Sequence, residues 1–173
     1  MPYTIVSGDL LLADTEYIVQ QNCCTAVKAH GLSEIIAQKF SGVNPYTERT
    51  RFKGNWATLE TRPKPGSIEI FENEAEEDTN TCKIICAFAQ YCHGKPGVYK
   101  DPLSALYGDT FEDRFTYFKQ CLELISDLKP KSVGFPYRIG CGLAGGSWSR
   151  YETAIKDWSL RNPTIDIKVY NMN

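Results

Sequence analysis

The sequence predicts a three-layer α/β/α fold, in which helices pack on both faces of a mixed central sheet of about six strands. Short apolar runs bounded by turn residues recur along the chain, and segments with helical spacing of apolar residues lie between them. In the second half, strands and helices alternate, which implies right-handed crossovers. With 173 residues, 42% of them hydrophobic, the chain is expected to form one domain over residues 1–173.

Six apolar runs are the expected strands. Most are rich in β-branched or aromatic residues and are bounded by residues that favour turns. They cover residues 3–7, 17–21, 67–71, 83–89, 132–136 and 166–170.

Three segments show the apolar periodicity of helices packed on a core. The first is expected over residues 31–40. The second begins with Asp109 as its cap and Glu112 in the capping-box position, and the third begins near Ser149 with Glu152 three residues later. A proline follows each of the last two segments and predicts where those helices end.

Two stretches fit no strand or helix, namely residues 41–66 and 91–108, and both are expected to be long surface loops. Loops of this size are often functional, although plain insertions are the alternative. The acidic run over residues 72–80 is expected to be a solvated hairpin tip.

Charge and cysteine content restrict the function. A formal charge of -2 with a pI near 5.7 gives no global basic field for a polyanion, so an anionic ligand must be bound locally. Seven cysteines, an odd number without a repeated spacing, do not form a disulfide framework and favour a reducing compartment. No secretion signal or membrane span is expected, which favours a cytoplasmic or nuclear protein.

The most informative segment is the glycine-rich stretch 135–148, which follows an expected strand and precedes an expected helix. Four glycines lie within the seven residues 140–146. Glycines let the backbone approach a ligand closely, and a strand-to-helix loop offers free N–H groups that bind phosphate. The stretch lacks the Gly-Lys-Ser/Thr of a Walker A loop. It is expected to cradle an anion, and a tight turn is the alternative.

This stretch closely resembles the second phosphate-binding loop of the macrodomain family. The variant Gly-Cys-Gly-Leu-Ala-Gly-Gly is most similar to the Appr-1''-p processing branch, the ADP-ribose 1''-phosphate phosphatases, with the terminal ADP-ribose glycohydrolases a related group. Segments 6–10, 18–23 and 31–33 support the resemblance in the same order. It implies a macrodomain fold and ligand contacts from Ile139, Gly140, Cys141, Gly142, Leu143, Ala144 and Gly145.

The resemblance also assigns an adenine end to the site. Asp9, followed by Leu10, would accept a hydrogen bond from the adenine exocyclic amine, and Tyr170 would stack on the adenine ring. An Asx turn after the first strand is the alternative role of Asp9. For Tyr170 the alternative is an edge residue that covers the core.

The distal ribose end is assigned to residues after the second and fourth strands. Asn22 would orient the ribose, Gly31 and Leu32 would open the helix beside the phosphates, and Gln90 would lie near the ribose. His30 stands where most relatives have a small residue and is the expected acid or base, together with Asn22 as the catalytic pair. A strand-end turn for Asn22 and a surface position for His30 are the alternatives.

Two further residue types bear on the chemistry. The glycohydrolase group uses a Lys near this strand end and an Asp after Gly-Cys-Gly-Leu, whereas this sequence has Gln90 and Ala144. Cys141 is expected to be a small packing residue rather than a nucleophile. No Cys and His spacing is typical of zinc, so neither a metal nor a cofactor is expected.

The sequence therefore predicts an ADP-ribose-binding protein that hydrolyses ADP-ribose 1''-phosphate or an ADP-ribosylated protein or nucleic acid. A reader domain without turnover is the main alternative, which the missing Lys and Asp would suit. A nucleic-acid-binding module that uses the basic stretch 49–64 is a third.

Overall fold

The computed structural model describes residues 3–73, 82–103 and 106–172. Within them, a six-stranded sheet has the order β1-β8-β7-β2-β6-β5, and β5 runs antiparallel to β6 while the other pairs are parallel. The strands are β1 (Tyr3–Ser7), β2 (Tyr17–Cys23), β5 (Ile68–Glu72), β6 (Lys83–Gln90), β7 (Ser132–Pro136) and β8 (Asp166–Asn171). All six predicted strands are confirmed, with some ends shifted by one or two residues.

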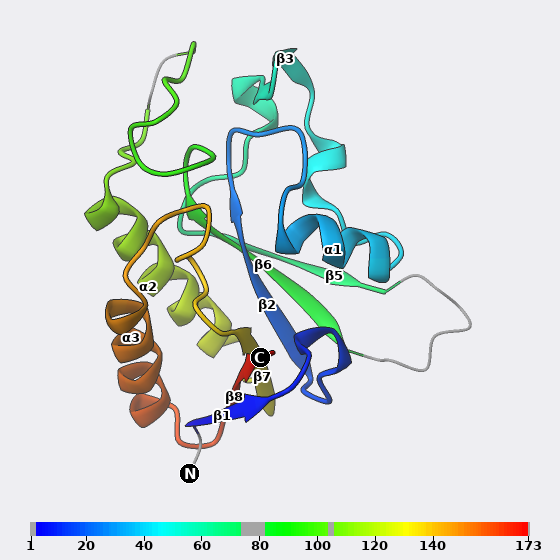
Figure 1. The fold of residues 1–173 in the computed structure, drawn as a ribbon, viewed down its shortest axis with the longest axis vertical. Helices are drawn as coiled ribbons and strands as arrows, with labels where there is room; N and C mark the ends of the chain where they lie inside the picture. The colour runs from blue at the N-terminus through cyan, green and yellow to red at the C-terminus, as the bar shows by residue number, and fades with distance from the viewer. Residues whose placement is uncertain (1–2, 74–81, 104–105, 173) are drawn as a thin grey trace.

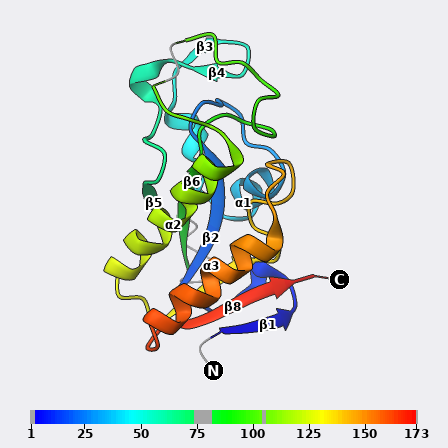
Figure 2. The same ribbon diagram turned by 90° about the vertical axis from the view of Figure 1, so that its left-hand side faces the viewer.

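Helices cover both faces of this sheet (Figures 1 and 2). Helix α1 (Leu32–Lys39) lies on one face, and α2 (Phe111–Asp127) and α3 (Trp148–Arg161) lie on the other. This arrangement confirms the three-layer α/β/α fold, and α1 keeps the predicted position between Gly31 and Phe40.

Apolar side chains fill the space between the layers. Under α2 and α3, Trp158 and Phe135 are fully buried and meet edge to face at 6.1 Å between ring centroids. On the opposite face, Ile36 and Phe40 are fully buried against the sheet. Trp158 is therefore a packing residue, and its Nε1 donates to Ser126 Oγ at 2.6 Å.

The start of α2 differs from the prediction by one residue. Its N-cap is Thr110, whose hydroxyl accepts from the Asp113 N–H, and the Asp113 carboxylate accepts from the Thr110 N–H. Asp109 and Glu112 were therefore wrong as the capping pair. Asp109 instead forms an ion pair with the buried Arg114, at 2.7 Å between Oδ2 and Nη2.

The predicted capping box of α3 was also wrong. The helix begins at Trp148 after Ser147, which makes no side-chain cap hydrogen bond. Ser149 lies with its Oγ 3.2 Å from the Ser147 Oγ, and Glu152 accepts from the Tyr3 hydroxyl at 2.8 Å. Glu152 therefore ties α3 to the edge strand β1 instead of capping its own helix.

The long stretch 41–66 contains local structure that the sequence did not predict. Two 3-10 turns flank a small antiparallel pair, which lies at the top of Figure 1. The elements are Pro45–Glu48, β3 (Arg51–Lys53), β4 (Trp56–Ala57) and Leu59–Thr61. Most of the expected acidic hairpin tip at 72–80 lies outside the described residues. Among the helices described, none is long and apolar enough to cross a membrane.

Candidate functional site at the carboxyl ends of the strands

The strands β2 and β7 lie side by side at the centre of the sheet, and their connections leave in opposite directions. They pair through Tyr17 with Val133 and Ile18 with Gly134, and β2 then continues past the end of β7. The chain after β2 leads to α1 on one face, and the chain after β7 leads to α3 on the other. In open α/β sheets, ligands bind at such a switch point, outside the carboxyl ends of the strands. The candidate site therefore lies between residues 24–31 and residues 137–147, which we call the glycine loop.

The two connections meet at Gly31 and Leu143. Gly31 has φ of 59°, in the left-handed region, and a Cβ at this position would lie 3.7 Å from Leu143 Cδ1. Leu143 is otherwise 70% exposed. Two segments that are far apart in the sequence are thus brought together.

The glycine loop folds back on itself. The Gly146 N–H donates to the Gly140 carbonyl at 2.9 Å, and a Cβ on Gly146 would lie 2.6 Å from that oxygen. Gly140 and Gly145 both have φ of 76°, which side chains rarely adopt. Gly142 differs, because its φ is not left-handed and no atom lies within 4 Å of where its Cβ would be. Backbone shape therefore requires Gly140, Gly145 and Gly146, but not Gly142.

The expected adenine-binding residues gather where β1 and β8 end. Tyr170 and Leu10 are buried and lie together over Gly134 of β7. The glycine loop begins beside them, since the Tyr137 N–H donates to the Tyr170 carbonyl at 2.9 Å. Asp9 is half-buried, and its Oδ1 accepts from the Leu11 N–H at 3.0 Å, which is the Asx turn considered above.

Asn22, the expected ribose contact, lies beneath the surface. It is 1% exposed, and its Nδ2 donates to the Tyr46 hydroxyl at 3.2 Å. The same hydroxyl accepts from the Cys23 N–H at 3.3 Å, and the Arg49 guanidinium lies over the Tyr46 ring at 4.4 Å. Asn22 Oδ1 is buried without a partner among the described residues. The stretch 41–66 therefore supports Asn22 from behind, a contact that no sequence pattern indicated.

His30 is exposed at the end of the 24–31 connection, immediately before α1. Ser33 fixes its backbone, accepting from the His30 N–H at 3.1 Å and donating to the His30 carbonyl at 2.8 Å. The chain's other histidine, His93, lies between Trp56 and Tyr99, with ring centroids 4.8 and 4.6 Å away. Burial lowers the pKa of His93, and the nearby His30 lowers it further. The two histidines thus lie near each other. Nothing in the sequence indicated that His93 lies close to His30.

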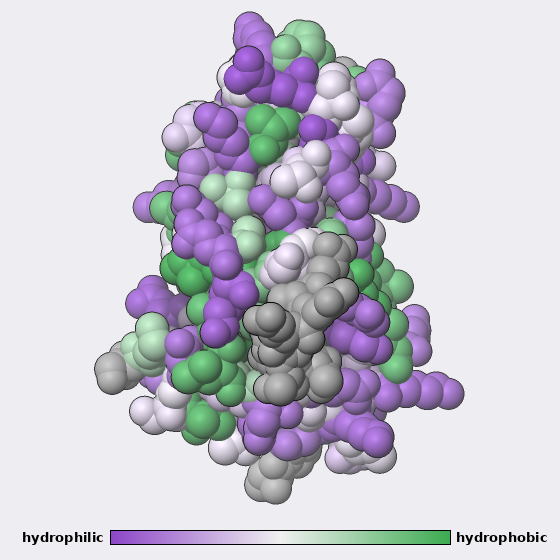
Figure 3. All heavy atoms as spheres, turned by 90° about the vertical axis from the view of Figure 1, so that its right-hand side faces the viewer, coloured by the Kyte–Doolittle hydropathy of each residue, from purple (hydrophilic) through white to green (hydrophobic). Residues whose placement is uncertain are grey.

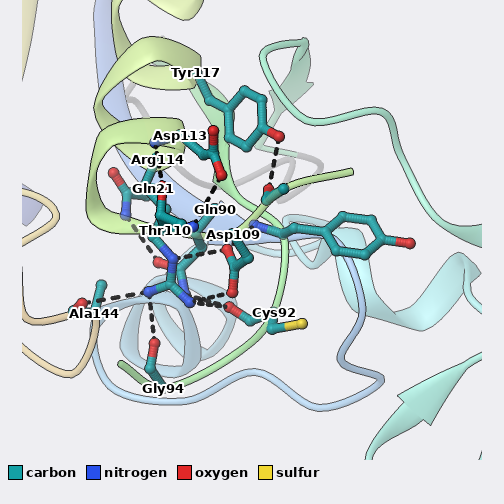
Figure 4. A network of polar contacts seen from close by, with 12 residues as sticks. Gln21, Gln90, Cys92, Gly94, Asp109, Thr110, Asp113, Arg114, Tyr117 and Ala144 are labelled. Atoms are coloured by element: carbon teal, nitrogen blue, oxygen red, sulfur yellow. Dashed lines mark hydrogen bonds and ion pairs between the residues drawn. The ribbon is translucent and has the colours of Figure 1, made fainter. Parts of the chain in front are cut away.

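Gln90 has both ends of its amide engaged (Figure 4). Its Nε2 donates to the Cys92 carbonyl at 3.0 Å, and its Oε1 accepts from Gln21 Nε2 at 2.8 Å. A carbonyl only accepts, so these two hydrogen bonds fix the orientation of both side-chain amides. Gln21 Oε1 then lies beside Gly140, 2.9 Å from where a Cβ on that glycine would be. Gln90 is 8% exposed and therefore supports the glycine loop from within the protein, through its hydrogen bond with Gln21.

Arg114 of α2 is the centre of the same network (Figure 4). It is 2% exposed and forms two hydrogen bonds with the Asp109 carboxylate, at 2.8 and 2.7 Å. Its remaining donors bond the carbonyls of Cys92 at 3.0 Å, Gly94 at 2.6 Å and Ala144 at 3.3 Å. Removing one partner of such a buried pair is costly, because the other charge is left without compensation. Arg114 thus joins α2, the end of β6 and the glycine loop.

Cys141 has the environment of a packing residue. It is 7% exposed, and its thiol donates to the Ile139 carbonyl at 3.3 Å. Burial raises the pKa of this thiol to about 11, which disfavours the thiolate that a nucleophile requires. Ile139 itself is buried in the core under α2 and α3.

Neither of the following two cavities is lined by residues 24–31. One, of about 230 Å³, lies behind the glycine loop, where α2 and α3 begin, and Arg114, Gly145 and Tyr151 are among its lining residues. The other, of about 210 Å³, is lined by residues that include Arg49, Glu69 and Phe88. The residues described contain no cluster of three or more His, Cys, Asp or Glu that could hold a metal ion.

The sheet order, its switch point and the paired loops define the macrodomain fold. The macrodomain of Mycobacterium tuberculosis DarG is similar, with a TM-score of 0.67 and 20% identity over 99% of this chain and 98% of that chain. The macrodomain of Thermus aquaticus DarG has a TM-score of 0.66 and 17% identity over 98% of this chain and 97% of that chain. These likenesses confirm the expected fold.

A third similar structure is Thermosipho africanus DarTG in complex with ADP-ribose. It has a TM-score of 0.65 and 15% identity, over 97% of this chain and 41% of that chain. No protein-family model matches the sequence, and no curated protein is significantly similar to it.

Proposed function

We propose that the chain is an ADP-ribose-binding macrodomain of the Appr-1''-p processing family and hydrolyses an ADP-ribose derivative at the distal ribose. The observation that carries this proposal is the meeting of Gly31 with Leu143, which joins the start of α1 to the glycine loop at the switch point. A helix start and a glycine-rich loop that meet at one place suit a diphosphate. The ADP-ribose bound in the similar DarTG structure is consistent with this ligand.

Each end of the proposed site suits one part of this ligand. At the end of β1, Asp9 Oδ1 caps the following turn, and Oδ2, which has no partner among the described residues, is free to accept from the adenine amine. Tyr170 lies beside the neighbouring Gly8, where a Cβ would be 3.9 Å from its Cδ1, and 9% of this residue is exposed. At the other end, His30 is exposed at the rim and suits an acid or base that acts on the distal ribose.

Two substrate classes fit this proposal. The Gly-Cys-Gly-Leu-Ala-Gly-Gly variant favours ADP-ribose 1''-phosphate, and ADP-ribosylated protein or nucleic acid is the second class. In each case the bond at the distal ribose is hydrolysed, with water as the nucleophile and His30 as the proton-transfer group.

The burial of Asn22 favours a second candidate function, an ADP-ribose reader without turnover. With its Nδ2 engaged by Tyr46, Asn22 presents little surface to a ribose. Gln90 and Ala144 also stand where the glycohydrolases have their Lys and Asp. A reader needs the ligand-binding site but no group for proton transfer.

A general nucleic-acid-binding module is less well supported, because two charges of the basic stretch are not available. Arg49 is 8% exposed and donates to the Ala26 carbonyl, and Arg62 forms a buried ion pair with Asp101 at 2.6 Å. Figure 3 shows mainly hydrophilic residues over the upper part of one face, with hydrophobic residues scattered among them.

The proposal is tested by binding and by product analysis. Calorimetry should show much tighter binding of ADP-ribose than of AMP, because AMP lacks the diphosphate and the distal ribose. Incubation with ADP-ribose 1''-phosphate and, separately, with ADP-ribosylated protein should release phosphate or ADP-ribose. Binding without a product would identify a reader, and equal affinity for AMP would contradict the two-loop site.

A further inference from the structure

The side chain of Lys95 lies across the glycine loop. A Cβ on Gly145 would lie 2.9 Å from Lys95 Cγ, 3.3 Å from Cδ and 3.4 Å from Cε. The aliphatic stem of the lysine therefore follows the surface of Gly145 along most of its length. Lys95 comes five residues after Gln90, in a stretch where the sequence indicated only a long loop.

Arg114 holds these two segments together. One nitrogen, Nη1, donates to the Gly94 carbonyl at 2.6 Å and to the Ala144 carbonyl at 3.3 Å. Gly94 and Ala144 immediately precede Lys95 and Gly145, so a single buried guanidinium group fixes the backbone on both sides of the contact. A turn after Lys95 adds to this, since the Val98 N–H donates to the Lys95 carbonyl at 3.2 Å.

The charge of Lys95 has no partner in the part of the chain that the structure describes. Among the described residues, no carboxylate or carbonyl accepts from its ammonium group, whereas the neighbouring Arg62 and Arg114 are paired with Asp101 and Asp109. Long side chains often bury their stem along a surface and keep the charged head in solvent. Here the stem lies against the loop that is proposed to bind phosphate, while the residue as a whole is exposed.

We propose that Lys95 is an anion-binding residue of this site, whose ammonium group neutralises the phosphate charge of a ligand held by the glycine loop. The inference rests on the proposed function and extends it, because neither the sequence nor the fold assigns a lysine to the glycine loop. It also gives Gly145 a second role: a side chain there would displace the Lys95 stem as well as strain the backbone.

Calorimetric titration of ADP-ribose into the wild type and three variants tests this inference. Lys95→Met keeps the stem without the charge, Lys95→Arg keeps the charge, and Lys100→Met removes another exposed lysine of the same segment. We expect Lys95→Met to weaken binding by about three- to tenfold, between the effects of an exposed ion pair and of a charged hydrogen bond. Lys95→Arg and Lys100→Met should bind within about twofold of the wild type, a change typical of the weakest exposed ion pairs.

Salt dependence separates a charge role from a packing role. Raising the ionic strength from about 0.05 to about 0.3 M should weaken the wild type more than Lys95→Met, because salt screens exposed charges. Equal affinity and equal salt dependence of the wild type and Lys95→Met would overturn the inference and leave the proposed function intact. Equal losses in Lys95→Met and Lys95→Arg would also overturn it, since a retained positive charge would then not preserve binding. A wild type that does not bind ADP-ribose would refute both proposals.

Discussion

Substitution of Gly142 by valine tests the phosphate-binding role of the glycine loop without disturbing the fold. The position is exposed, its φ is not left-handed, and no atom lies within 4 Å of the position of an added Cβ. An added Cβ therefore meets no other part of the protein at this position. If the loop binds phosphate as proposed, a β-branched side chain here would obstruct the approach of the phosphate.

The expected losses differ widely between stability and binding. Surface substitutions without a specific contact usually change the free energy of unfolding by less than about 0.5 kcal/mol, which is about 1–2 °C in Tm for a chain of this size. A hydrogen bond to a charged group contributes about 1.5–3 kcal/mol. The loss of one such hydrogen bond from the loop to a phosphate weakens the binding of ADP-ribose by roughly ten- to hundredfold.

Calorimetry of ADP-ribose binding and thermal unfolding of Gly142→Val give both quantities on one protein. Gly145→Val is the contrast, because its φ of 76° and the Lys95 stem predict a loss of stability together with a loss of binding. If Gly142→Val binds ADP-ribose as tightly as the wild type, the glycine loop does not hold the phosphates and the reasoning fails.

Three further predictions follow from single side chains. Asp9→Asn keeps an acceptor for the Leu11 N–H but should weaken the binding of ADP-ribose about tenfold or more, because a charged acceptor is lost. Unchanged affinity would show that Asp9 only shapes the turn and does not contact the ligand. His30→Ala should still bind ADP-ribose while product formation falls by about 10²–10⁴ if His30 transfers the proton, and full activity would exclude that role. With a pKa of about 11, Cys141 should be alkylated slowly at a pH near 8 and faster as the pH rises toward 11. Mass spectrometry measures the extent of alkylation. Rapid modification of the folded protein at the lower pH would contradict the prediction that Cys141 is a protonated thiol.

The strands, the helices and the glycine loop were predictable from the sequence because their signals are local. A strand needs a short apolar run between turn residues, and a helix needs apolar residues three and four positions apart. The glycine loop combines four glycines with a preceding strand and a following helix, and all of this lies within residues 132–161. The expected sheet and its three layers follow from these local patterns and from the handedness of crossovers.

The helix caps show where local patterns become ambiguous. Asp109 and Thr110 are both good N-caps, and Glu112 and Asp113 are each three residues further on, so the sequence offers two equivalent boxes. The tertiary structure decides between them, because buried Arg114 requires the Asp109 carboxylate and leaves Thr110 to cap the helix.

The side chains that meet at the site were decided by the tertiary structure alone. The sheet order brings Gly31 beside Leu143, Asn22 beneath Tyr46 and Lys95 across Gly145, and these pairs are separated by 24 to 112 residues. No periodicity encodes such contacts, because they depend on how strands pair and on which carbonyls a buried Arg114 can reach. The sequence by itself indicated which segments are candidates for a ligand-binding site. The packing of distant segments determined which of their side chains stay exposed to solvent, as with His30, and which are buried within the protein, as with Asn22 and Gln90.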